Sequence, residues 1–130
     1  MPRAAADARA ARGFNGDIDR HYQTWRAALH SDPNGRHLDI ASLGRRVARK
    51  TLLAVAGLVS VHDTTWTTDR VSAAHRWSQL HPTFASASAS LVQWSEGATA
   101  SEEQLHQTLA SGGIVAQAVD DSRTNIGLWR

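Results

Sequence analysis

The chain has 130 residues, of which 42% are hydrophobic and 20% are charged, with a formal net charge of +2 and no cysteine. This length allows about one domain with one core, and the absence of cysteine excludes disulfide bonds and thiolate chemistry. The small net charge argues against nucleic acid as a partner, because dedicated nucleic-acid-binding proteins carry a dense basic stripe. The first residues contain no apolar targeting run, so we expect a cytoplasmic protein.

Alanine and leucine carry most of the apolar content, which favours an all-α fold. Residues 1–16 are expected to form a flexible tail, because Gly13 and Gly16 end an alanine- and arginine-rich stretch. The domain is expected over residues 17–130, and it starts with an amphipathic helix over 17–30. The apolar positions of this helix recur at helical spacing: Ile18, Tyr22, Trp25, Leu29.

The second predicted helix, over residues 39–62, contains the longest apolar run of the chain. From Leu52 to Val61 only Ser60 is polar, so this half is apolar on every side. A helix of that kind must be surrounded by others, which predicts the central helix of a bundle. The run is shorter than the ~20 apolar residues that cross a bilayer, so we expect no membrane contact.

Three more helices are predicted after this one, over about 68–80, 82–96 and 102–119. The fourth helix carries serines at 86, 88, 90 and 95, so packing must hold it. The fifth begins with the capping-box spacing of Ser101 and Gln104, and Gly112-Gly113 should kink it or split it in two. Short connections then predict a five-helix, mostly antiparallel up-and-down bundle around the central apolar helix.

Two patterns could suggest a metal site, and neither supports one. Asp17 and Asp19 lie at the front of a helix, where residues i and i+2 point roughly 200° apart and cannot grip one ion. The seven histidines form no HExxH motif, and no cysteine is present to complete a closed zinc site. No metal site is therefore predicted.

A basic cluster directly precedes the apolar run of the central helix. Arg45, Arg46, Arg49 and Lys50 share one side of this helix by their spacing. They form either a solvated face or a surface for the phosphates of a nucleotide or an acidic partner domain. The candidate nucleotide-binding residues are Arg46, Arg49 and Lys50.

An arginine followed five residues later by a histidine, Arg70 and His75, resembles the R-x4-6-H signature of helical ribonucleases of the HEPN group. In that group the pair is thought to act on the scissile phosphate, so these two residues are the catalytic candidates of this alternative. The polar residue that usually follows the arginine is replaced by Val71. The competing interpretation is that both residues lie on a helix surface.

Residues 49–82, RKTLLAVAGLVSVHDTTWTTDRVSAAHRWSQLHP, combine a basic-ended apolar helix, a short connection, an aromatic residue, a cap and a helix with a tryptophan. This order resembles the C-terminal helical domain of nucleotidyltransferases of the aminoglycoside adenylyltransferase type. The catalytic half of that family carries a Gly-Ser turn and two carboxylates on a strand, which this chain lacks.

The resemblance implies an accessory domain that borders the nucleotide and substrate cleft of such an enzyme. This domain has no catalytic residues and is expected to be inactive by itself. Magnesium and ATP are implied for a complete family enzyme, and no cofactor is expected on this chain by itself. The implied partner is a catalytic nucleotidyltransferase domain or a second copy of the chain. A further alternative is a non-catalytic helical protein-interaction module, with an exposed apolar patch around Trp25, Trp66 or Trp129.

Overall fold

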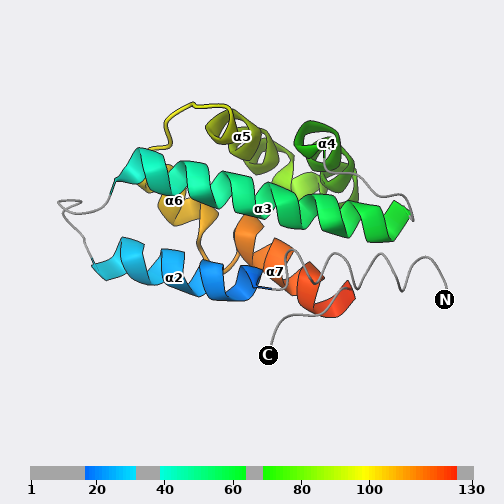
Figure 1. Ribbon diagram of the computed structural model, residues 1–130, viewed down its shortest axis with the longest axis horizontal. Coiled ribbons are helices and arrows are strands. Elements are labelled where there is room, and N and C mark those ends of the chain that lie inside the picture. Colours follow the sequence, from blue (N-terminus) through cyan, green and yellow to red (C-terminus); the bar gives the residue numbers. More distant parts are fainter. Residues whose placement is uncertain (1–16, 32–38, 64–68, 126–130) are drawn as a thin grey trace.

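The computed structural model describes residues 17–31, 39–63 and 69–125, and these ranges contain helices but no strand (Figure 1). The all-α prediction is confirmed. The elements in chain order are α2 (Ile18–Ser31), α3 (Ile40–Asp63), α4 (Arg70–Leu80), a 3-10 turn η1 (Pro82–Phe84), α5 (Ala85–Ser95), α6 (Glu102–Thr108) and α7 (Ile114–Asn125).

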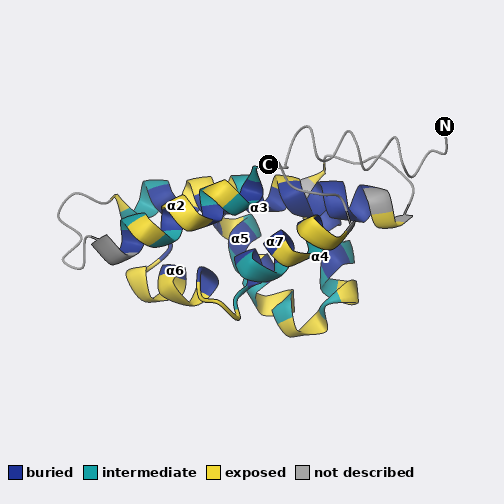
Figure 2. Ribbon diagram, turned by 90° about the horizontal axis from the view of Figure 1, so that it is seen from below, coloured by how far each residue is buried: buried dark blue, intermediate teal, exposed yellow. Residues whose placement is uncertain are grey.

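Helix α3 is the central element, as its apolar run predicts. It packs against α2, α4, α5 and α7, and most of its length is buried (Figure 2). Val55 and its apolar neighbours belong to one hydrophobic cluster that extends from Ile18 in α2 to Val119 in α7. Leu53 differs from the prediction, because its position is exposed. Within the described ranges, no helix has the length and apolarity needed to cross a membrane.

The helices are not all parallel or antiparallel to α3. Figure 1 shows α2 beside α3 and running in the opposite direction, whereas α4 and α5 are seen nearly end-on and so cross α3. An up-and-down order through every helix is therefore not confirmed. The fifth predicted helix is observed as two, α6 and α7, which are separated at the predicted interruption.

The break between α6 and α7 has a steric cause at Gly113. A Cβ atom at this position would lie 2.6 Å from the carbonyl oxygen of Thr108 and 2.7 Å from that of Gln107. Only a residue without a side chain allows the backbone to fold back so closely. The predicted capping box at the start of α6 is also confirmed: Ser101 Oγ accepts from Gln104 N at 3.1 Å, and Ser101 N donates to Gln104 Oε1 at 2.9 Å.

Two side-chain hydrogen bonds join helices that are distant in sequence. The Tyr22 hydroxyl in α2 donates to the Leu109 carbonyl after α6 at 3.1 Å. The buried Trp77 indole in α4 donates to Asp121 Oδ2 in α7 at 3.2 Å, and His81 Nε2 lies 2.8 Å from the same oxygen. The first bond is buried and the second is partly buried, and they tie α2 and α4 to the C-terminal part of the bundle.

Candidate functional site

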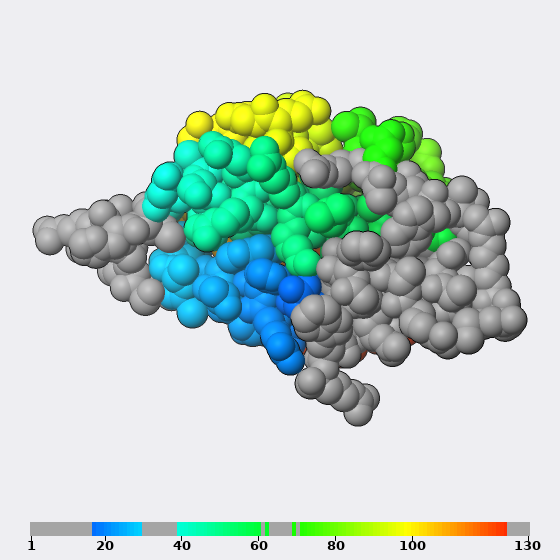
Figure 3. Space-filling view, in the orientation of Figure 1, coloured from blue at the N-terminus to red at the C-terminus, as the bar shows by residue number. Residues whose placement is uncertain are grey.

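The basic cluster lies on the first half of α3, which Figure 3 shows beside α2 on one face of the molecule. The structure divides this cluster into two parts. Arg45, Arg46 and Arg49 are exposed, and no ion pair joins their guanidinium groups to another residue of the described part. Lys50 instead turns toward α2: its side chain is 21% exposed, and its Nζ lies 2.8 Å from Asp17 Oδ1. The three arginines are therefore the members of the cluster that face solvent.

Asp17 is the partner that holds Lys50 in place. Its Oδ2 lies 3.0 Å from His21 Nε2, one helical turn further along α2. Burial of the carboxyl group alone would raise the pKa of Asp17, but the hydrogen bond and positive charge of Lys50, with His21 in support, outweigh burial and lower this pKa. Asp17 is thus a charged structural residue between α2 and α3.

Asp17 and Asp19 do not converge on one point, as the helical spacing predicts. Asp19 Oδ1 contacts Arg123 Nη2 at 3.9 Å, on the side of α7 rather than of α3. Within the described residues, no group of three or more histidine, aspartate or glutamate side chains could hold a metal ion.

The Arg70 and His75 pair is not tested by the structure, because the Arg70 side chain lies outside the described part. His75 is exposed on α4, where its Nε2 lies 3.5 Å from Gln79 Nε2. The ribonuclease interpretation therefore stays a prediction. For the interaction-module alternative, Trp25 is buried and contributes to no exposed patch, whereas Trp66 and Trp129 lie outside the described residues.

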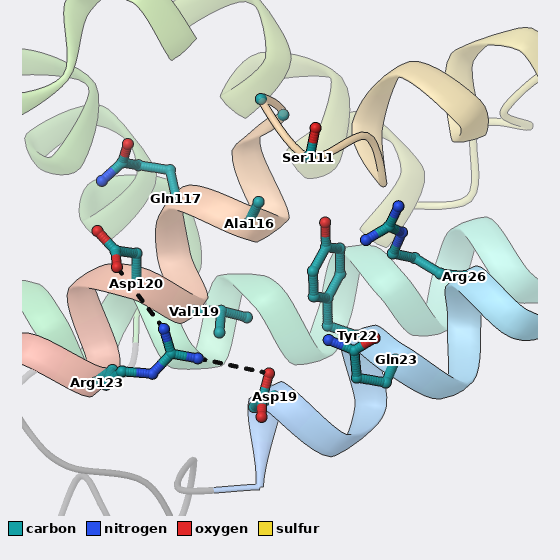
Figure 4. Close-up of a pocket in the computed structure, with 12 residues that line it drawn as sticks. Asp19, Tyr22, Gln23, Arg26, Ser111, Ala116, Gln117, Val119, Asp120 and Arg123 are labelled. Carbon is teal, nitrogen blue, oxygen red and sulfur yellow. Dashed lines mark ion pairs between the residues drawn. The ribbon is translucent and has the colours of Figure 1, made fainter.

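A pocket of about 390 Å³ opens between α2 and α7 (Figure 4). Four charged side chains line it, Asp19 and Arg26 from α2 and Asp120 and Arg123 from α7. Arg123 lies between the two carboxylates, with Nη2 3.9 Å from Asp19 Oδ1 and Nη1 3.9 Å from Asp120 Oδ1. The second cation, Arg26, has its Cζ 5.4 Å from the centre of the Tyr22 ring.

The contacts of Arg123 are long and open to water. Its side chain is 59% exposed, and exposed ion pairs of this kind contribute ~0–1 kcal/mol. A primary ammonium group could therefore replace the guanidinium between Asp19 and Asp120 at low cost. The sequence could not predict that Asp19 and Asp120 line one pocket, because about a hundred positions separate these residues and no local spacing links them.

No protein-family model, curated protein or solved structure matches the chain.

Proposed function

We propose that this chain is a helical accessory domain that borders the nucleotide and substrate cleft of a nucleotidyltransferase in the cytoplasm. The observation that carries the proposal is the exposed row of Arg45, Arg46 and Arg49 on α3, which is free of carboxylate partners within the described residues. Guanidinium groups bind phosphate oxygens with paired N–H donors. Arg46 and Arg49 would contact the nucleotide phosphates, and Lys50 would have to leave Asp17 to join them.

The pocket between α2 and α7 supports the second half of the proposal. Its two carboxylates are held only loosely by Arg123. A cationic group of the substrate would pair with them in place of the arginine. In this proposal α6 and α7 together correspond to the fifth helix of the predicted five-helix bundle. The magnesium, and the carboxylates that hold it, come from a catalytic domain or partner.

The first test is enzymatic. The purified chain, incubated with magnesium ATP and a panel of aminoglycosides, is expected to yield no adenylylated product by mass spectrometry, because the described residues contain no group of three or more metal-binding side chains to hold the magnesium. Turnover by the chain alone would contradict the accessory role. Cleavage of RNA that disappears in His75→Ala would favour the ribonuclease instead.

The second test is a titration with magnesium ATP, in which binding is monitored by the NMR signals of the α3 amides. We expect Arg46→Ala and Arg49→Ala each to weaken binding about tenfold, which is the loss of one charge-assisted contact. Arg20→Ala is the matched control, since it removes the same charge from an exposed position of α2. Equal affinity in all three variants would contradict the assignment of the nucleotide to α3.

A further inference from the structure

The serines of α5 have different roles in the structure. Ser88 is buried and donates to the Ala74 carbonyl of α4 at 3.4 Å, and Ser95 donates to the Val92 carbonyl at 2.7 Å. Ser86 and Ser90 do not serve the packing of α4 on α5. One helical turn apart, they line a pocket that α5 and η1 form with α6 and α7. The serine-rich composition of this helix is therefore explained only in part by packing.

This pocket has a volume of about 420 Å³, within the range of ~300–1,000 Å³ that is typical of small-molecule sites. None of its lining residues carries an ionisable side chain, in contrast to the pocket between α2 and α7. We call it the neutral pocket. Gln104 and Gln107 of α6 line the same pocket as Ser86 and Ser90, and Phe84 and Trp94 supply aromatic carbon.

Two of these side chains are held in position by the fold. Gln104 Oε1 accepts from Ser101 N in the capping box at 2.9 Å, so its Nε2 group is the part left to donate into the pocket. The Phe84 ring is stacked on Trp77, with 6.0 Å between the ring centres. Trp94, which also lines the pocket, is only 4% exposed. Groups fixed before binding lose little entropy when a ligand arrives.

The lining decides the class of ligand. A charged ligand would lose hydration without meeting an opposite charge, and a wholly apolar one would leave hydroxyl and amide groups without water or partner. An uncharged sugar ring satisfies both conditions, because its hydroxyl groups pair with serine and glutamine while its C–H face packs on an aromatic ring. We propose that the neutral pocket binds an uncharged monosaccharide. This inference does not depend on the nucleotide surface of α3.

The test is an NMR titration of the full chain with glucose, galactose, mannose and N-acetylglucosamine. We expect at least one of them to shift the amide signals of α5 and α6 saturably, with a dissociation constant on the order of 1 mM. The charged counterparts glucose 6-phosphate and glucosamine should bind at least about tenfold more weakly. No saturable shift up to the solubility of every neutral sugar, or equal binding of the charged ones, would overturn the proposal.

Variants locate the binding. The double variant Ser86→Ala and Ser90→Ala removes two hydroxyl groups that are not buried, so its helicity by circular dichroism should match the wild type. Its affinity for the bound sugar should fall about tenfold. Thr124→Ala, which removes an exposed hydroxyl group near the end of α7 and outside both pockets, is the control and should bind like the wild type. A sugar that binds the double variant unchanged places the site elsewhere and refutes the assignment.

Discussion

At the residue scale, the ion pair between Asp17 and Lys50 makes part of the stability depend on pH. The folded state lowers the pKa of Asp17 below its ordinary value of 3.8, so this contribution is complete above that value and is lost as the pH falls through the lower folded pKa. Asp17→Asn should reduce the free energy of unfolding by about 1–2 kcal/mol at neutral pH, because Lys50 then lacks its counter-charge. Its acid dependence should become shallower.

Urea unfolding of both proteins, at about pH 7 and at about pH 3, measures this effect. Asp120→Asn is the control, because Asp120 is exposed and its contact with Arg123 is long; its effect should stay within about 0.5 kcal/mol. If Asp17→Asn and the wild type differ by the same amount at both pH values, the electrostatic role of Asp17 is wrong.

At the scale of the elements, the connection between α6 and α7 depends on one of two adjacent glycines. Gly113→Ala should destabilise the protein by about 2 kcal/mol or more, since its Cβ would meet backbone carbonyl oxygens, which cannot rotate away. Gly112→Ala meets nothing within 4 Å and should be neutral or slightly stabilising. Thermal unfolding followed by circular dichroism compares the two. Equal melting temperatures would contradict the steric explanation.

The elements were predictable to the extent that their signals are local. The capping pattern of Ser101 and Gln104 and the double glycine locate the start of α6 and its break from α7. Asp69 caps α4, and its side chain accepts from Val71 N. The crossing of α4 and α5 over α3 was not predictable, because it depends on how buried surfaces fit together. The pocket between α2 and α7 was missed for the same reason: Asp19 and Asp120 reach the same residue, Arg123, only in the folded chain.

At the scale of the whole molecule, the core is organised around α3, and two adjacent leucines of this helix differ sharply in burial. Leu52 is 0% exposed and Leu53 is 37% exposed. Leu52→Ala should lower the free energy of unfolding by about 2–5 kcal/mol, through lost burial and the cavity that remains. Leu53→Ala should cost less than about 1 kcal/mol. Chemical denaturation measures both losses of stability. Similar losses for the two variants would mean that α3 does not bury Leu52 and expose Leu53 as described.

The sequence predicts this central role of α3 because ten consecutive positions contain a single polar residue, Ser60. The same run conceals the exposure of Leu53, since a helix apolar on every side has no pattern to indicate its outer face. The inward direction of Lys50 was not predictable either, because the spacing of Arg46 and Lys50 does not distinguish a side chain that faces solvent from one that turns to Asp17.

Lys50 is also the only lysine of the chain. Apart from the terminal amine, it is the single target for acylating reagents, and its contact with Asp17 shields it while α2 rests on α3. The rate at which an activated ester labels Lys50 therefore reports how often its contact with Asp17 opens, and the protein carries its own probe of that opening without any introduced tag.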